Sequence, residues 1–358
     1  MISISLCMIV KNEEKVLARC LESVKDIADE VIIVDTGSSD KTKKIAFNYT
    51  DKVFDFKWCD DFSKARNFSF SKATKEYIMW LDADDVILKE DKEKLINLKH
   101  TLNKDTDIVM LKYNTGFDEN GNVNFSYYRE RILKREKNYT WISPVHEVIV
   151  PTGNVIYKDI AVTHKKNHGA HSKRNLKIFE NMIKNGSLLD ARQKFYYARE
   201  LYYNGKYEEA ISKFNEFLLD PLGWNENKIN ACLDLSYCYL KLNDKENAFL
   251  SLTRSFIYDT PRAEICCNIA KLFKNDKRYK EAIYWYNLAT TLTPDFSSGA
   301  FYNLDTYNFI PYMELCVCYY AINDVKNSIK CNELAGKFKP NSTVYLNNKE
   351  FFKNLMPK

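Results

Sequence analysis

The chain has 358 residues, of which 45% are hydrophobic and 28% are charged, and only 10 are glycine. Glycine at about 3%, where roughly 7% is usual, excludes collagen-like and low-complexity architectures and predicts long helices with few tight turns. The 53 Lys and Arg residues exceed the 48 Asp and Glu residues by five, spread along the chain, so a dedicated nucleic-acid binder is not expected. The length predicts two domains, each able to bury a core.

The N-terminal segment MISISLCMIVKNEE is too short for a membrane span and lacks the basic flank of a signal peptide. We interpret it as a buried strand of a cytoplasmic protein without a membrane span. The ten cysteines are then expected to remain thiols, and no zinc site is expected at Cys316 and Cys318 because a second pair of ligands is missing. Seven cysteines lie in amphipathic helical stretches: Cys232, Cys238, Cys266, Cys267, Cys316, Cys318 and Cys331.

From residue 1 to about 165, short apolar runs rich in β-formers alternate with helical patterns. This alternation predicts βαβ crossovers and an α/β domain with a mostly parallel sheet. Polar residues follow the ends of two runs, in DTGSSD and DADD, at the edge where open α/β sheets bind ligands. The runs are ISLCMIV, EVIIVDT, KVFDF, YIMWLDA, DIVMLKY and WISPVHEVIV, and the helical patterns include EEKVLARCLESV and SDKTKKIAF.

After about residue 172 the strand signal stops and loosely repeated segments begin, at spacings of about 34 to 46 residues. They resemble tetratricopeptide repeats, although the usual Trp and Gly of the first helix are mostly replaced and only Gly205 keeps that glycine. Because one unit cannot bury its own face, the units must stack, and we expect about four helical hairpins. Alignment places Ala210, Ala248, Ala282 and Ser328 at one small-residue position, and Pro221, Pro261, Pro294 and Pro340 at the unit ends.

The sequence Asp82-Ala83-Asp84-Asp85 follows the apolar run YIMWL. Carboxylates at the end of a strand can bind a hard divalent cation, which holds a diphosphate and neutralises its leaving charge. Taken alone, an Asp-x-Asp pair is more often a solvated turn. No G-x-G-x-x-G or G-x-x-x-x-G-K-[ST] motif is present, so neither a Rossmann dehydrogenase nor a P-loop ATPase is supported.

Three segments in order, SLCMIVKNEE, EVIIVDTGSSDKT and DDFSKARNFSFSKATKEYIMWLDADD, resemble family 2 glycosyltransferases of the GT-A fold over residues 1 to about 165. With the repeats, the chain is similar to the subgroup with a tetratricopeptide tail, which includes lipopolysaccharide-core-type glucosyltransferases and bacteriocin peptide S-glycosyltransferases. The resemblance implies a GT-A catalytic domain over 1–170, Rossmann-like with a mostly parallel sheet. It implies an all-α, tetratricopeptide-like domain over 172–358.

Position by position, the resemblance also implies a donor site and a site for Mn²⁺ or Mg²⁺. The alternatives from the residues alone are an exposed turn for Asp35 and a helix cap for Asp40. The implied positions are Val10, Lys11, Asn12 and Glu13 around the nucleotide, Asp35 accepting from uracil or ribose, Arg66 near the base or diphosphate, Asp82 near the ribose and metal, and Asp84 as direct metal ligand.

The base and the second metal ligand are harder to place. Glu147 is the best candidate for the catalytic base, by its position after the Asp-x-Asp, unless WISPVHEVIV is simply a surface strand edge. His164 is the candidate to complete the metal shell with Asp84, and His146 competes with it. Arg129 and Arg131 are candidates to clamp the diphosphate or acceptor, although a charged strand face explains them equally well.

The resulting hypothesis is an inverting, metal-dependent transfer of a hexose, of glucose or N-acetylglucosamine type, from a UDP-sugar to an acceptor hydroxyl or thiol. The acceptor would be a peptide or protein held by the repeats, or a cell-surface glycan or lipid. The alternative is a sugar-nucleotide-binding interaction module without turnover. A homodimer through the repeats, near residues 340–358, is a further hypothesis. The sugar, the acceptor and the oligomeric state stay open from the sequence.

Overall fold

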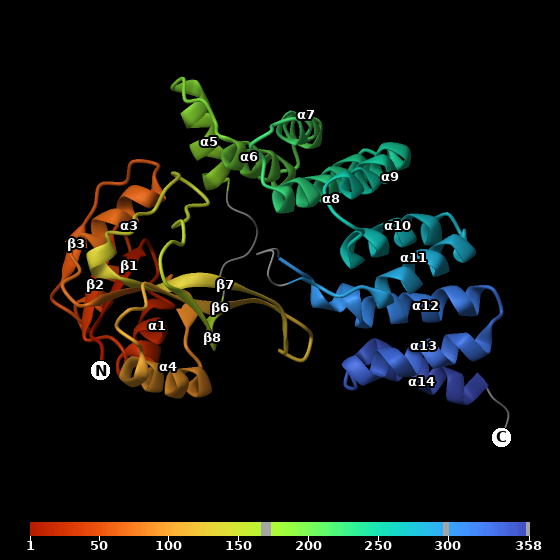
Figure 1. The fold of residues 1–358 in the computed structure, drawn as a ribbon, viewed down its shortest axis with the longest axis horizontal. Coiled ribbons are helices and arrows are strands. Elements are labelled where there is room, and N and C mark those ends of the chain that lie inside the picture. The colour runs from red at the N-terminus through yellow and green to blue at the C-terminus, as the bar shows by residue number, and fades with distance from the viewer. Residues whose placement is uncertain (166–172, 296–300, 356–358) are drawn as a thin grey trace. The chain divides into compact units, whose positions relative to one another are not determined.

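A computed structural model describes residues 1–165, 173–295 and 301–355, and Figure 1 shows its fold. The chain forms two compact units, Met1–Thr115 with Ser126–Asn185, and Gly116–Phe125 with Gly186–Lys358. The first is an α/β unit and the second is built mainly of helical repeats, which confirms the predicted fold class.

The first unit is built on one eight-stranded sheet, in the order β3-β2-β1-β4-β7-β6-β8-β5. The pairs β1–β2, β1–β4, β2–β3 and β6–β8 are parallel, whereas β4–β7 and β5–β8 are antiparallel. The strands are β1 (Ile4–Val10), β2 (Glu30–Asp35), β3 (Val53–Asp55), β4 (Tyr77–Trp80), β5 (Asp85–Val86), β6 (Ile108–Phe117), β7 (Val123–Lys134) and β8 (Val155–His164).

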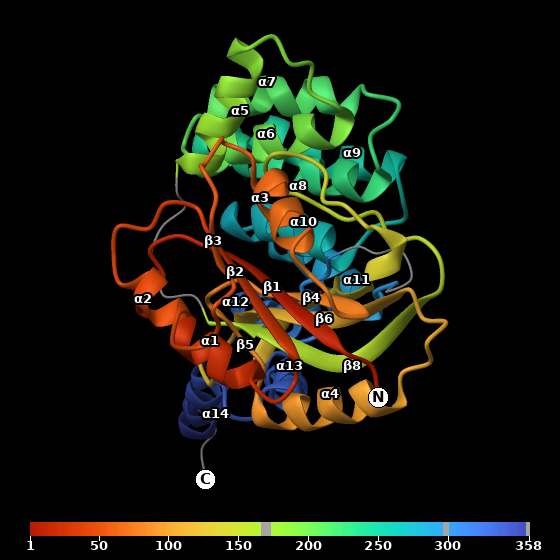
Figure 2. The same ribbon diagram turned by 90° about the vertical axis from the view of Figure 1, so that its left-hand side faces the viewer.

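Helices cover both faces of this sheet, so its central strands are buried on both sides. The helices of this unit are α1 (Leu17–Val24), α2 (Thr42–Ala46), α3 (Phe62–Phe70), α4 (Lys89–Thr101) and α5 (Arg174–Lys184). Alternate side chains of β1 and β4 pack toward α1 and α4 in one apolar cluster, and those between them pack toward α3 in another. Figure 2 shows α3 on one side of β2, β1 and β4, and α1 and α4 on the other.

One apolar run departs from the expected strands. Residues 141–150 form no strand, and their ladder is reduced to the single bridge between Ile142 and Val148. Pro144 lacks the amide that a ladder needs, and both Ser143 and His146 have positive φ angles, which break an extended strand. Strands form instead at β7 and β8, on either side of this segment.

Glu30 anchors the start of β2, at the edge of the sheet opposite to the polar strand ends. Its buried carboxylate accepts hydrogen bonds from Ser5 Oγ, from the Thr74 amide and hydroxyl, and from Lys52 Nζ. Burial opposes its ionisation, but these hydrogen bonds outweigh burial and lower the pKa of Glu30 from 4.5 to about 2. The ionised form is therefore the one that stabilises the fold.

Glu30→Gln is expected to lower the free energy of unfolding at neutral pH by up to about 3 kcal/mol. Because the folded pKa lies below the unfolded value, this contribution is present above about pH 4.5 and is lost as the pH falls toward about 2. The variant should thus show a flatter acid dependence over that window in urea titrations. Glu22→Gln, at the exposed Glu22–Lys25 pair, is the control and should leave the free energy of unfolding nearly unchanged, because exposed ion pairs contribute little.

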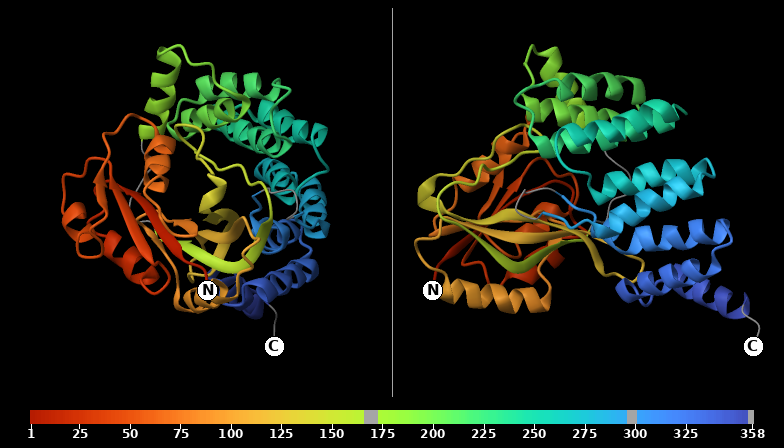
Figure 3. Two further views of the ribbon diagram at one scale, coloured as in Figure 1. Left: turned by 60° about the vertical axis from the view of Figure 1, so that its left-hand side comes forward. Right: turned by 45° about the vertical axis from the view of Figure 1, so that its right-hand side comes forward.

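In the second unit, antiparallel helix pairs follow one another along the chain (Figures 1 and 3). The four aligned small residues are all fully buried on the second helix of a pair, where a larger side chain would prevent close packing, and each aligned Pro follows such a helix. The pairs are α6 (Ala191–Tyr203) with α7 (Tyr207–Leu218), α8 (Asn225–Lys241) with α9 (Lys245–Arg254), α10 (Ala263–Asn275) with α11 (Tyr279–Thr291), and α12 (Phe309–Ala321) with α13 (Val325–Phe338), followed by α14 (Thr343–Leu355).

Each hairpin turns at a residue with left-handed backbone, two positions after its first helix ends. These residues are Gly205, Asn243, Lys277 and Asn323, with φ angles of 77°, 62°, 60° and 64°. Glycine adopts this conformation without a steric cost and asparagine tolerates it, but lysine does not. The turn at Lys277 therefore carries strain that the other three avoid.

Lys277→Gly is expected to stabilise the second unit by about 0.5–1 kcal/mol, because relief of the strained φ exceeds the added entropy of the unfolded chain. Thermal unfolding measures this as a rise in melting temperature. Asn323→Gly, at the equivalent turn, should give a smaller change. A lower melting temperature for Lys277→Gly would contradict the assignment of strain.

All ten cysteines are free thiols, nine of them buried and Cys59 exposed. Among the described residues, no helix is both long and apolar enough to cross a bilayer.

Candidate active site

Asp35 ends β2 beside Val10, which ends β1, because the two strands are parallel and in register at this pair. The residue is only 2% exposed, so Asp35 does not lie in an exposed turn. Oδ1 accepts from the amides of Gly37 and Ser38, both at 2.9 Å, and Gly37 reaches this position with a φ of 103° that favours glycine. Oδ2 is buried and has no hydrogen-bond partner among the described residues, which leaves one acceptor for a ligand.

The segment after β1 joins this strand end through its backbone. Asn12 has a φ of 57°, its amide donates to Ser38 Oγ at 2.9 Å, and its Oδ1 accepts from the Ser39 amide at 2.8 Å. Asn12 therefore ties the loops after β1 and β2 together. Val10 is buried in the core and Lys11 is exposed, and the Glu13 amide donates to Thr42 Oγ1 at 2.7 Å.

Asp40 has a local structural role. It accepts from the amide and hydroxyl of Thr42 and from the amide of Glu14. It does not cap α2 in the usual position, since the residue before that helix is Lys41.

Asp82 follows β4 at the same edge of the sheet as Asp35, because β1 pairs in parallel with both β2 and β4. Its Oδ1 accepts from Arg66 Nη2 at 2.8 Å. Burial opposes ionisation of Asp82, but the guanidinium groups of Arg66 and Arg131 outweigh it and lower the pKa of this carboxyl to about 2. Asp82 is therefore a carboxylate at neutral pH.

Arg66 lies on α3 and joins Asp82 to Glu147. Its Nε donates to Glu147 Oε1 at 2.7 Å, and its side chain is only 9% exposed. Its guanidinium carbon lies 5.1 Å from the ring centre of Trp80 and 4.8 Å from that of Trp141, so two indole faces enclose the charge. Arg66 is thus an internal bridge between two carboxylates.

The segment that carries Glu147 is held against α3 by its own hydrogen bonds. Asn67 on α3 exchanges two hydrogen bonds with the backbone of Trp141, at 2.8 and 2.9 Å, and the Phe62 amide donates to the carbonyl of Pro144 at 2.8 Å. This docking brings Glu147 to Arg66, which is 81 residues away in sequence. His146 lies differently, with its ring stacked at 6.4 Å from that of Phe179.

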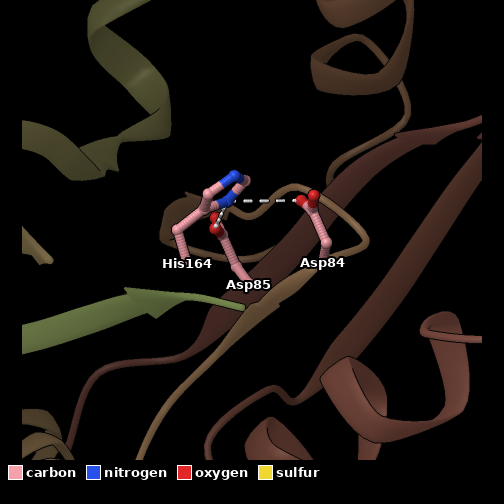
Figure 4. Close-up of side chains that lie close together, drawn as sticks. All are labelled: Asp84, Asp85 and His164. Atoms are coloured by element: carbon pink, nitrogen blue, oxygen red, sulfur yellow. Dashed lines mark hydrogen bonds and ion pairs between the residues drawn. The ribbon is translucent and has the colours of Figure 1, made fainter. Parts of the chain in front are cut away.

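Asp84, Asp85 and His164 form a group whose ligand atoms lie within 4.8 Å of one another, close enough to hold one metal ion (Figure 4). Asp85 starts β5 and pairs in register with His164, the last residue of β8. His164 Nδ1 lies 3.2 Å from Asp85 Oδ1 and 3.4 Å from Asp84 Oδ1. The structure thus brings Asp84 and His164 together, and His146 is not in this group among the described residues.

The two aspartates of this group are not equivalent. Asp85 is fully buried and accepts from the Tyr113 hydroxyl at 2.8 Å, from Arg131 Nη1 at 3.2 Å and from the Asp82 amide at 3.1 Å. Asp84 remains 17% exposed. Asp85 is therefore saturated by protein donors, and Asp84 offers the more available oxygens.

Burial and nearby charges shift the pKa values of Asp84 and His164. Burial, followed by the charges of Asp82 and Asp85, raises the pKa of Asp84 against the opposing effect of His164. Burial alone would lower the pKa of His164, but its hydrogen bond with Asp85 and the three nearby carboxylates raise it instead. A divalent cation would relieve this accumulation of negative charge, and the oxygen and imidazole donors fit such an ion.

Arg129 and Arg131, the candidates to clamp the diphosphate or acceptor, both pair with carboxylates of the first unit. Arg131 is fully buried, donates to Asp85 and to the carbonyl of Trp80, and lies over the Trp80 ring at 3.8 Å. Arg129 pairs with Glu130 at 3.0 Å and lies 5.0 Å from the centre of the same ring. Arg131 thus stabilises the buried carboxylate of Asp85.

Two residues of this site escaped sequence reasoning. Asp85 is part of the DADD motif, but the sequence does not show whether Asp84 or Asp85 is the buried carboxylate. Tyr113 lies in the apolar run of β6. A tyrosine in such a run is expected to be a core residue, so the sequence does not indicate a polar role.

Asp35 ends β2 and His164, of the Asp84-Asp85-His164 group, ends β8, and open α/β sheets bind their ligands at such strand ends. Residues 5–175 match the family described as Glycosyl transferase family 2, and residues 263–296 match the tetratricopeptide repeat. The chain therefore carries a domain of glycosyltransferase family 2, followed by tetratricopeptide-type repeats.

Two relatives match different shares of the chain. The SPbeta prophage-derived glycosyltransferase SunS of Bacillus subtilis is 29% identical over 261 residues, covering 68% of this chain and 60% of that protein. A TPR repeat-containing protein of Synechococcus elongatus is 49% identical over 90 residues, covering 25% of this chain and 22% of that protein. The chain thus spans less than two thirds of the length of these relatives.

Among solved structures, Staphylococcus aureus TarS 1-349 in complex with UDP-GlcNAc matches with a TM-score of 0.38 and 17% identity, covering 70% of this chain and 91% of that one.

Proposed function

We propose that this chain is an inverting, metal-dependent hexosyltransferase that moves a sugar of glucose or N-acetylglucosamine type from a UDP-sugar to an acceptor hydroxyl or thiol. The observation that carries the proposal is the meeting of Asp35, Asp82 and the group of Asp84, Asp85 and His164 at one edge of the sheet. In this proposal residues 1–170 form the catalytic domain, and residues 172–358 hold the acceptor or a partner.

The donor would be held by backbone and carboxylate groups. The unpartnered Oδ2 of Asp35 supports a role as acceptor for a hydroxyl or imide group of the nucleoside. The loop of Lys11, Asn12 and Glu13 would form the adjoining wall. Arg66 supports the site indirectly, because it keeps Asp82 ionised and in place.

Asp84 and His164 would hold the divalent ion, which when bound neutralises the charge that develops on the leaving diphosphate. Asp85 would hold both in position. Oxygen ligands suit Mg²⁺ and Mn²⁺ alike, whereas an imidazole ligand favours Mn²⁺ of the two. We therefore propose Mn²⁺ as the preferred ion.

Glu147 would accept the proton of the attacking group. Arg66 donates to one of its oxygens, Oε1, and orients the carboxylate. A hydroxyl acceptor depends on such a base, while a thiol forms its nucleophilic thiolate near neutral pH with less help. The effect of changing Glu147 thus distinguishes the two kinds of acceptor.

The experiment is release of UDP from UDP-glucose and from UDP-N-acetylglucosamine, with Mn²⁺, Mg²⁺ or excess EDTA, followed by mass spectrometry of a lysate for an added hexose. Turnover of one donor that EDTA abolishes and Mn²⁺ restores is the expected result. Equal turnover of wild type and Asp84→Ala in every condition would refute the metal assignment. Donor binding by calorimetry without release of UDP would favour a sugar-nucleotide-binding module instead.

A further inference from the structure

Residues 142–148 form a closed loop that carries Glu147. Its two ends are tied by two backbone hydrogen bonds that Ile142 and Val148 exchange, at 2.9 and 3.1 Å. Within the loop, Pro144 has a fixed φ and two further residues have positive φ angles. Because the ends are tied and the backbone is restricted, a displacement at the start of the loop is passed on to Glu147.

Hydrogen bonds join this loop to α3 at its start, its middle and its end. Asn67 on α3 makes the first contact, since its Oδ1 accepts from the Trp141 amide at 2.8 Å and its Nδ2 donates to the Trp141 carbonyl at 2.9 Å. In the middle, the Phe62 amide donates to the Pro144 carbonyl at 2.8 Å. At the end lies the hydrogen bond that Glu147 accepts from the guanidinium on α3, at 2.7 Å.

The contact at Asn67 depends on the side chain being an asparagine. Trp141 is buried and lies outside the strands, so its amide and carbonyl need partners from elsewhere. Asparagine supplies both, because its side chain carries an N–H donor and an oxygen acceptor on one carbon atom, as a peptide group does. Among the described residues, these two backbone groups of Trp141 have no other hydrogen-bond partner.

We propose that Asn67 is a positioning residue for Glu147, because it fixes the orientation of the loop that presents this carboxylate to the acceptor. The part that concerns catalysis rests on the proposed function above. When the Asn67 side chain is removed, the bond from Phe62 and the pair with Arg66 remain, and they keep the loop on α3. One is a single bond at the middle of the loop and the other involves two flexible side chains, so the loop is free to turn about them.

A turned loop displaces the base without weakening the binding of the donor. Within the part of the chain that the structure describes, the side chain of Asn67 bonds to Trp141 and not to the carboxylates at the strand ends. A misplacement of about 1 Å can lower a rate by about 100-fold. Loss of Asn67 should therefore lower kcat and leave KM for the UDP-sugar unchanged.

The first measurement does not depend on activity. Full-length protein labelled with ¹⁵N-tryptophan gives a backbone amide signal for each of its five tryptophans, and Trp141→Phe assigns that of Trp141. We expect the Trp141 amide to exchange slowly with deuterium in the wild type and much faster in Asn67→Ala. The amide of Trp285, inside α11, should exchange slowly in both. A Trp141 amide with the same exchange rate in the wild type and in a folded Asn67→Ala would overturn the proposal.

The second measurement is the release of UDP with water as acceptor, in the wild type, Asn67→Ala, Glu147→Gln and the double variant. Water attacks through an O–H group, so it depends on a base as a hydroxyl acceptor does. We expect Asn67→Ala to lower kcat by up to about 100-fold, and to have no further effect in the Glu147→Gln background. Asn154→Ala is the matched control, because it removes an amide bonded to the carbonyl of Asp105 at 3.1 Å, and should leave kcat unchanged.

Two results of this cycle would overturn the proposal. One is a folded Asn67→Ala that works at the wild-type rate although Glu147→Gln is slow. The other is an undiminished effect of Asn67→Ala in the Glu147→Gln background, which would show that Asn67 acts through another group.

The two measurements separate this inference from the proposed function. Release of UDP by Glu147→Gln at the wild-type rate refutes Glu147 as the base, and a loss of rate in Asn67→Ala would then also overturn the positioning role. Where no UDP-sugar is turned over, the proposed function fails, and exchange of the Trp141 amide alone decides whether Asn67 holds the loop.

Discussion

Asp84→Asn is expected to lower metal-dependent release of UDP by about 100-fold or more, while the fold stays intact. A bound divalent ion stabilises the leaving diphosphate by several kcal/mol, and each 1.36 kcal/mol corresponds to about tenfold in rate. Because burial and two neighbouring carboxylates raise the pKa of Asp84, its charge destabilises the metal-free protein. The melting temperature of Asp84→Asn in EDTA should therefore equal or exceed that of the wild type.

Asp85→Asn is the matched comparison, one residue along. Asp85 is the buried partner of Arg131, which is itself fully buried, so its loss leaves an uncompensated charge and should lower the free energy of unfolding by about 3 kcal/mol. Denaturant titrations in EDTA measure this difference between adjacent aspartates. Similar destabilisation by both substitutions would contradict the division of roles between them.

Glu147→Gln is expected to lower kcat by about 10²–10⁴-fold with a hydroxyl acceptor, because the amide cannot take up the proton. Its carbonyl oxygen can still accept the hydrogen bond from Arg66 Nε, so the bridge and the fold should persist. With a thiol acceptor the loss should be small, since a thiolate forms without a strong base. Transfer is measured by mass spectrometry of the acceptor after the donor and acceptor are identified.

Glu136→Gln, an exposed glutamate paired with Lys134, serves as control and should leave transfer unchanged. A hydroxyl acceptor glycosylated at the wild-type rate by Glu147→Gln would show that another group is the base.

The fold of both units was largely predictable because its signals are local. β1 and β2 are mostly apolar runs, as strands buried on both faces require, and polar residues lie at their ends, where open α/β sheets bind ligands. The repeats were visible through Ala210, Ala248, Ala282 and Ser328, since only a small side chain fits where two helices approach closely. The prediction of a strand at residues 141–150 was wrong, because apolar content alone does not make a strand where Pro144 and two residues with positive φ angles interrupt it.

The sequence by itself determined that carboxylates follow the strand ends, that Asp84 and His164 are candidate ligands, and that a helical repeat follows an α/β domain. Only the tertiary structure decided which aspartate of the Asp84-Asp85 pair is buried, because burial depends on β6, β7 and β8, which deliver Tyr113, Arg131 and His164 from distant parts of the chain. It also decided that Arg66 joins Asp82 to Glu147. Adjacent residues look alike in a sequence, whereas the partners that distinguish their charges are assembled by strand pairing and by packing against α3.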